Sequence, residues 1–191
     1  MDLQHVNVKL LVQNPHEVEL EPLIPIFQGW IEDQANGELL LDIADYRHVD
    51  AGPGVILIGY EGDISVDNTD NRLGVRYNRK AAMDGNNQDR LKHAARAALI
   101  ACQRLESDPR MGGKLRFNGQ EIEVFMNDRL VAPNRDATRE AVHSDFQLFF
   151  QQLFQGSEYS MSYGSDPRRL FGVSLKAAQP FSVANLLERL T

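Results

Sequence analysis

Cysteine is almost absent from this chain, and its absence excludes two kinds of structure. The only cysteine among the 191 residues is Cys102, so no internal disulfide can form and paired-cysteine metal ligands are missing. The five histidines do not replace them, because no two stand at the HxH or HxxxH spacing of a zinc site. We therefore expect no metal site, and no motif indicates a cofactor.

Long apolar runs are absent as well. No stretch of the sequence approaches the roughly 18 apolar residues of a membrane-crossing helix. The first residues, MDLQHVNVKL, lack the basic segment and the following apolar segment of a secretory signal. These features predict a cytoplasmic protein with no membrane partner.

Positive charge is in short supply. Twenty Lys and Arg residues against 27 Asp and Glu residues give a formal net charge of −7. An acidic chain is soluble and is not attracted to phosphate backbones. We therefore expect no nucleic-acid partner, although this balance does not exclude a local basic patch.

The remaining composition is that of an ordinary globular domain. Apolar residues make up 42% of the chain and charged residues 25%, close to the averages for globular proteins. A chain of this length buries roughly 70% of the surface that its unfolded form exposes. We expect a single domain over 1–191, with any subdivision near 80–90 or 107–113, where polar, glycine-containing loops interrupt the pattern.

The segment 52–68 is predicted to lie in the middle of a sheet. Its apolar run from Val55 to Ile58 is uninterrupted and is flanked by Gly54 and Gly59. Such a run is typical of a strand covered on both faces. We therefore expect the whole run in the core.

Periodicity predicts the other elements. Residues 5–12 alternate as in a half-buried strand, with Val6 and Val8 on one side and Asn7 and Lys9 on the other. Apolar spacing of the helical kind recurs in four other segments. Further strands are expected at 39–44, 63–67, 72–78, 159–163 and 170–175, and helices at 19–36, 91–105, 141–154 and 182–190.

This order of elements determines the expected fold class. The helices are too few and too clumped for the alternating units of a parallel sheet. The sequence therefore predicts an α+β fold, a largely antiparallel or mixed β-sheet with three main α-helices packed on it and a short C-terminal helix.

One dipeptide predicts a tight turn. Asn118-Gly119 stands between the apolar runs 114–117 and 121–126. Both turn residues tolerate positive φ, which is typical of a type I′ hairpin. We therefore expect two strands joined here.

Helix caps and the lone cysteine can also be placed. Asp136 or Asn134 is expected to cap the third helix, and Ser182 the last one. Cys102 lies in the core-facing row of the second helix. A buried apolar cysteine is usually inert, so we interpret Cys102 as a packing residue.

The glycines of 52–62 do not form a nucleotide loop. Gly52-Pro53-Gly54 precedes a strand, whereas a phosphate loop needs GxxxxGK or GxGxxG at the start of a helix. We interpret these glycines as turn residues.

The densest group of reactive side chains follows the strand expected at 39–44. Asp45, Tyr46, Arg47 and His48 stand together there, and loops at strand ends often carry function. His48 could titrate near neutral pH beside the carboxylates. The alternative interpretation is a solvated polar loop.

Two carboxylates stand close together in the next turn. Glu61 and Asp63 would share a strand face and could divide acid and base roles or bind a cation. The same residues also suit a solvated hairpin end, and the sequence places no third ligand beside them.

A basic patch interrupts the acidic chain at 76–80. Arg76, Arg79 and Lys80 suit the recognition of a carboxylate or phosphate. Arg168-Arg169 forms a second basic pair, and Arg129 follows the run at 121–126. The alternative for all of these cations is ion pairing within the chain.

Our first hypothesis is a non-catalytic binding or interaction protein that acts as a homo-oligomer. The helix over 141–154 has more apolar side chains than a narrow stripe requires. Such a helix is either deeply buried or paired with another subunit. The side chains in question are Phe146, Phe149, Phe150, Leu153 and Phe154.

The competing hypothesis is an enzyme or a sensor that acts on a small anionic ligand. It requires the fold to bring the loop 45–48 and the strand end at 76–80 to one edge of the sheet, with a pocket between them. Its catalytic candidates are Tyr46, His48, Glu61 and Asp63, and its ligand-binding candidates are Arg76, Arg79 and Lys80.

Overall fold

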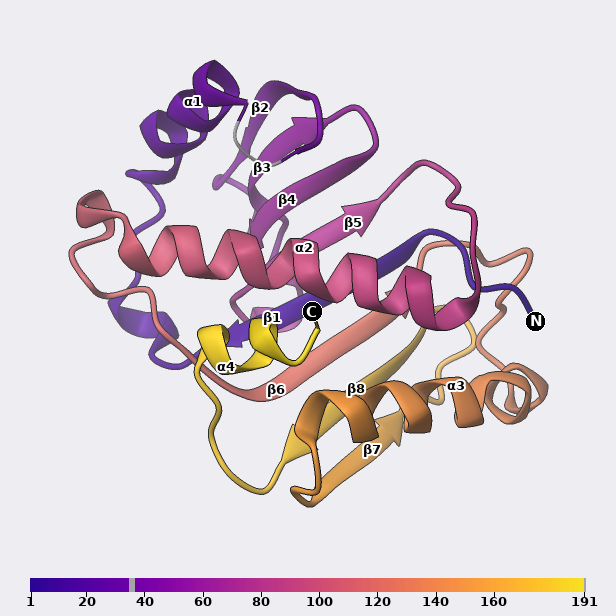
Figure 1. Cartoon of the computed structure of the whole chain (residues 1–191). Helices are drawn as coiled ribbons and strands as arrows, with labels where there is room; N and C mark the ends of the chain where they lie inside the picture. The colour runs from indigo at the N-terminus through magenta and orange to yellow at the C-terminus, as the bar shows by residue number, and fades with distance from the viewer. Residues whose placement is uncertain (35–36, 191) are drawn as a thin grey trace.

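The strands of this chain form one antiparallel sheet. The structure is a computed structural model that describes residues 1–34 and 37–190. Within these residues the strand order is β2-β3-β4-β5-β1-β6-β8-β7 (Figure 1). The strands are β1 (Val6–Val12), β2 (Leu40–Tyr46), β3 (Gly54–Gly59), β4 (Gly62–Asp67), β5 (Gly74–Arg79), β6 (Phe117–Met126), β7 (Tyr159–Tyr163) and β8 (Phe171–Ala177).

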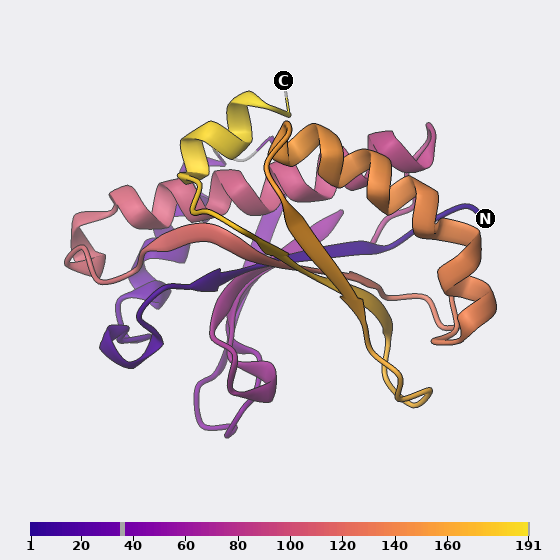
Figure 2. The same cartoon turned by 90° about the horizontal axis from the view of Figure 1, so that it is seen from below.

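The α-helices of the described chain cover one face of the sheet, and loops project from the opposite face (Figure 2). The second helix packs on β1 and β5, the first on β2 and β3, and the last on β6. We call the other side of the sheet the open face. The predicted α+β fold with an antiparallel sheet is confirmed. The helices are α1 (Leu23–Asp33), α2 (Asn87–Ser107), α3 (Asp136–Phe154) and α4 (Val183–Glu188).

No helix in the described part of the chain combines the length and the apolar character needed to cross a membrane.

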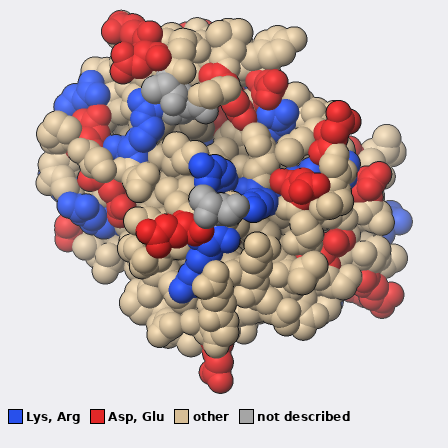
Figure 3. Space-filling view, viewed as in Figure 1, with Lys and Arg blue, Asp and Glu red and all other residues tan. Residues whose placement is uncertain are grey.

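Over the helix-covered face, acidic and basic side chains are interspersed (Figure 3). The most buried charged side chains of the sheet lie on the other side.

Alternation along the strands explains the core. Val55 and Leu57 of β3 face the helices and are fully buried, whereas Ile56 and Ile58 face the open side and are only half-buried. The expectation that the run is covered on both faces is therefore wrong. Helices pack on one face only, so the uninterrupted run reflects a strand whose open side is also apolar.

The central strand β1 shows the opposite difference, because it is more buried than its sequence pattern predicts. Val6, Val8 and Leu10 lie in the core as expected. The polar residues on the other side are buried too: Asn7 has no exposed surface, and Lys9 exposes 2%. β1 is therefore covered on both sides, which the half-buried pattern did not predict.

The predicted hairpin at Asn118-Gly119 is wrong. β6 runs through these residues, and the segments on both sides of them pair with β1: Phe117 opposite Val12, and Ile122 opposite Leu10. Gly119 has the positive φ of +62° that the pattern indicated. It is used for an irregularity within one strand, where the Phe181 amide donates to the Asn118 carbonyl at 2.7 Å.

Of the two predicted N-terminal helix caps, the cap of α4 is confirmed and the cap of α3 is not. Ser182 Oγ accepts a hydrogen bond from the Asn185 amide at 3.1 Å and caps α4. The cap position of α3 is Arg135, and its side chain makes no capping bond. Asp136 lies in the first turn, and Asn134 donates to the Asp166 carbonyl instead, so the predicted cap of α3 is wrong.

The chain itself covers the aromatic face of α3. All five of its expected apolar side chains expose 2% or less, and Phe150 and Phe154 contact Tyr159 of β7. The feature that suggested an oligomer therefore has an explanation within one subunit. Cys102 is fully buried, and burial raises the pKa of its thiol well above the usual range.

Candidate functional site

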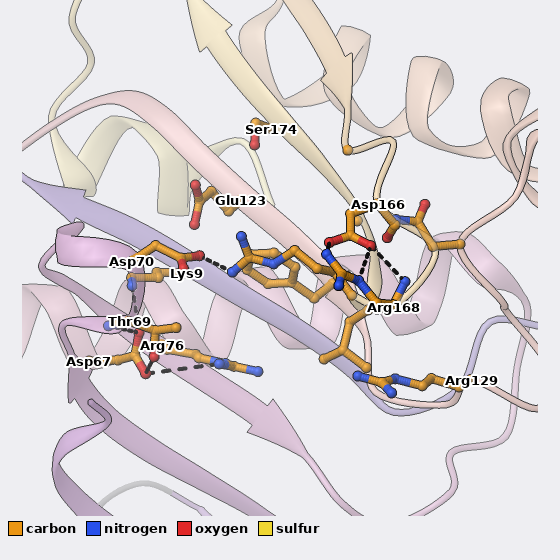
Figure 4. A pocket seen from close by; sticks show the side chains of 16 residues that line it. Lys9, Asp67, Thr69, Asp70, Arg76, Glu123, Arg129, Asp166, Arg168 and Ser174 are labelled. Carbon is orange, nitrogen blue, oxygen red and sulfur yellow. Dashed lines mark hydrogen bonds and ion pairs between the residues drawn. The ribbon is translucent and has the colours of Figure 1, made fainter. Parts of the chain in front are cut away.

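A cavity of about 430 Å³ lies on the open face of the sheet (Figure 4). We call it the open-face pocket. Its floor is formed by four neighbouring strands, β5, β1, β6 and β8, and its walls by 67–70, 129–134 and 164–170. Strand register brings the floor side chains together, because Arg76 stands beside Lys9, Lys9 beside Glu123, and Glu123 beside Ser174.

A buried ion pair joins the floor of the pocket to one of its walls. Lys9 Nζ lies 2.5 Å from Asp67 Oδ1, and both side chains are at most 3% exposed. The Thr69 hydroxyl donates to the second oxygen of Asp67 at 2.9 Å. The Lys9 ammonium is therefore already neutralised and is held in place.

Two ion pairs form the walls. Arg168 donates to both oxygens of Asp166 at 2.9–3.0 Å, and these hydrogen bonds keep the pKa of Asp166 below its usual range. Arg169 pairs with Asp70, which lies in the short turn η2 (Thr69–Asn71). This second pair links the loop after β4 to the loop after β7.

Two arginines of the open-face pocket have no carboxylate of their own. Asp67, Asp70 and Asp166 are matched as described, and Glu123 pairs with Arg72 at 3.2 Å. Two of the lining cations, Arg76 and Arg129, then remain. Within the described residues, Arg129 has no ion-pair partner, and Arg76 comes only within 3.9 Å of Asp67, which Lys9 already neutralises.

The surroundings of Arg76 also leave its guanidinium without a full set of hydrogen-bond partners. Its guanidinium lies 5.5 Å from the centre of the Phe125 ring, and its Nε is buried and has no hydrogen-bond partner in the described structure. In Figure 4 the guanidinium groups of Arg76 and Arg129 point toward each other. An unsatisfied buried donor beside an unmatched cation is typical of a place where an acceptor binds.

A neighbouring side chain is also unsatisfied. Asn7 stands between Asn78 of β5 and Phe125 of β6. Neither its amide nitrogen nor its oxygen has a partner in the described structure, although the residue is fully buried. The polar positions of β1 on the open face therefore do not serve packing alone.

A second, smaller cavity of about 200 Å³ lies under α2 on the helix-covered side. At its polar end the Tyr77 hydroxyl donates to Glu38 at 2.7 Å, and His93 Nε2 lies 3.2 Å from the same carboxylate oxygen. Burial alone would raise the pKa of Glu38. The bonds from His93 and Tyr77 and the charge of Arg79 outweigh burial and lower it.

The structure brings together only some of the residues singled out from the sequence. Glu61 pairs with Arg79 at 2.7 Å, and Asp63 pairs with Lys80 at 2.7 Å. Arg79 also lies 3.3 Å from Glu38, which lines the second cavity. The Glu61–Arg79 pair is therefore connected to that cavity. Both pairs lie at the turn between β3 and β4.

The loop after β2 lies at the other end of these strands. Tyr46 stands opposite Gly54 at the start of β3, while Asp63 stands opposite Ile58 near its end. Four residues of strand separate the two positions by about 13 Å. His48 stacks on Tyr46 at the same far end, so the shared site required by the enzyme hypothesis is not formed.

Arg76 is the one predicted ligand-binding residue in the open-face pocket. It lies on the opposite face of β5 from Arg79, because side chains alternate along a strand. Lys9, Asp67 and Glu123 were missed as site residues. A polar residue that alternates with valines indicates a solvated strand face, and only the strand order shows that Lys9 lies at the centre.

Comparisons with family models, curated proteins and solved structures found no match. Among the described residues, no group of three or more His, Cys, Asp or Glu side chains is arranged to hold a metal ion. The site is therefore interpreted from its own geometry and charge.

Proposed function

We propose that this chain is a non-catalytic binding protein that holds a small anionic ligand in the open-face pocket. The observation that carries the proposal is the pair of arginines left after every lining carboxylate is matched to a cation. Two guanidinium groups directed at one space suit a doubly charged acceptor such as a phosphate group.

The apolar part of the pocket supports a ligand larger than the anion alone. Phe125 and Leu170 line the cavity beside the charged groups. The Arg76 guanidinium lies near the Phe125 ring. An aromatic or aliphatic body attached to an anion bound by Arg76 would therefore contact the Phe125 ring. We therefore favour an organic phosphate over inorganic phosphate.

The state of the lining groups supports binding rather than catalysis. Among the lining residues, which are all described, there is no histidine and no cysteine. Each lining carboxylate is held by a cation, so none is free to act as a general base. A charged floor without an available base suits recognition.

Calorimetric titration with phenyl phosphate, inorganic phosphate and benzoate at constant ionic strength tests the proposal. Phenyl phosphate is expected to bind most tightly, because it combines a dianion with an aromatic body. Arg76→Gln and Arg129→Gln should each weaken its binding by roughly tenfold or more, the usual effect of losing hydrogen bonds to a charged group.

Arg168→Gln with Asp166→Asn is the matched control. It makes the same arginine change in the same pocket, but it also removes the carboxylate that Arg168 holds, so the charge balance of the pocket is kept. Its affinity for phenyl phosphate should stay close to that of the unmodified protein. Equal losses in all three variants, or no binding of any probe, would overturn the proposal.

The competing proposal, an enzyme or sensor acting on a small anionic ligand, has less support. It would use the second cavity, where Glu38, Tyr77 and His93 meet and to which Glu61 and Arg79 connect. His93→Gln separates the two proposals. It leaves phenyl phosphate binding unchanged if the open-face pocket is the site, and reduces it if the second cavity is.

A further inference from the structure

The two edges of the sheet differ in how they are protected from pairing with another strand. Unpaired backbone groups at a sheet edge are a template for an added strand, and charged residues or bulges prevent this. Strand β2 forms one edge and carries Asp42 and Asp45. It also has an irregular register between Leu40 and Asp42. This edge is protected.

Strand β7 forms the other edge and has neither device. Its sequence is Tyr159-Ser160-Met161-Ser162-Tyr163, with no charge and no proline. Its pairing with β8 is regular over all five residues. An uncharged edge strand without a bulge favours addition of another strand.

The sequence of β7 is a palindrome centred on Met161. If β7 pairs antiparallel with a second β7 about that residue, each Tyr159 faces a Tyr163, each Ser160 faces a Ser162, and the two methionines meet at the axis. Aromatic pairs and hydroxyl pairs are favourable cross-strand neighbours. Such self-complementarity is what an isologous two-fold contact requires.

We propose that two copies of this chain associate through β7, with a two-fold axis at Met161 that joins the two sheets into one. The inference does not depend on the anion-binding proposal. Beyond the strand, Glu158 stands opposite Gly164 of the partner subunit, so no like charges face each other. A two-fold axis perpendicular to the sheet places both open faces on the same side.

An exposed apolar residue beside β7 extends the proposed contact. Leu148 on α3 exposes 56% of its surface. The preceding residue, Gln147, accepts a hydrogen bond at its carbonyl from the Tyr159 hydroxyl, which places this turn of α3 next to β7. In a dimer through β7, Leu148 lies at the margin of the contact.

Charge pairs engineered at the two serines test both the dimer and its register. Ser160 and Ser162 are exposed, so their substitution should not disturb the fold. Ser160→Asp with Ser162→Asp places like charges opposite each other and should weaken dimerisation by roughly tenfold or more. Ser160→Asp with Ser162→Lys places opposite charges there and should restore it.

Sedimentation equilibrium over micromolar concentrations gives the dissociation constants. The proposal expects a dimer for the natural sequence and the Asp/Lys variant, and a shift to monomer for the Asp/Asp variant. A monomer for the natural sequence at all concentrations overturns it. A dimer that both variants leave unchanged also overturns it, because association would then use another surface.

Cross-linking at the axis gives a second readout. Met161→Cys brings two thiols together across the axis, where the Cα separation of a strand pair suits a disulfide. The natural Cys102 is buried and does not compete. Oxidation should produce a covalent dimer, and a variant that stays monomeric under oxidation would contradict the proposed axis.

Discussion

The two faces of the sheet bury different kinds of side chain on the same strand. On β1, Val8 and Leu10 pack under the helices, while Asn7 and Lys9 are equally buried on the open face. Apolar burial is enough to stabilise a fold. A buried ion pair seldom adds stability over apolar residues of the same shape. Folding stability is therefore expected to come mainly from the helix-covered face, and the buried charges of the open face support the proposal that its pocket binds a ligand.

The largest effect should come from breaking the buried pair on the open face. Lys9→Met leaves the Asp67 carboxylate buried beside no ammonium. Removing one partner of a buried pair typically costs about 3–5 kcal/mol. Urea unfolding should show a loss of this order in the free energy of unfolding.

The double variant is the control for this loss. Lys9→Met with Asp67→Asn removes both charges and keeps an oxygen for the Thr69 amide. It should recover at least half of the lost stability, because no unpaired charge is left buried. A double variant as unstable as the single one would mean that the pair itself stabilises the fold.

Two adjacent residues of β3 allow the stability contributions of the two faces to be compared directly, because one side chain lies on each face. Leu57 is fully buried under the helices, and Ile58, which has the same number of carbon atoms, is half-buried on the open face. Leu57→Ala should cost about 2–5 kcal/mol through lost burial and a cavity. Ile58→Ala should cost clearly less, and equal losses would show that the open face is covered.

A smaller effect is expected from the polar cluster on the helix-covered side. The pKa of Glu38 in the folded chain lies below its usual value of 4.5, so the folded state binds this proton more weakly than the unfolded state. Its stabilising contribution is then present above about pH 4.5 and is lost as the pH falls through the folded pKa. Glu38→Gln should reduce the loss of stability between pH 6 and pH 3.

The matched measurement is urea unfolding of both proteins across this pH range. Other carboxylates titrate in both, so the difference between the two curves isolates Glu38. Parallel curves would mean that Tyr77, Arg79 and His93 do not hold Glu38 in its ionised form.

Sequence periodicity predicted most of the helical core. Leu91, Ala95, Cys102 and Leu105 lie in the helix expected at 91–105, and all four are buried on α2, because a helical stripe depends only on local spacing. The failure at Asn118-Gly119 has a non-local cause. Pairing of both flanking segments with β1 prevailed over the local turn preference.

The candidate site could not be predicted from the sequence for the same reason. Lys9 and Asp67 are 58 positions apart, and Asp70 and Arg169 are 99 apart. Only the order β4-β5-β1-β6-β8 brings them together. The sequence did single out Arg76 and the second basic pair, because clustered arginines in an acidic chain are visible without the fold.

Titration of phenyl phosphate while observing the arginine Nε–H resonances by NMR is the most direct test of the central claim. The account predicts that the signals of Arg76 and Arg129 move with one common dissociation constant, while that of Arg168, already held by Asp166, stays in place. Signals that all stay in place, or a uniform shift of every arginine, would contradict it.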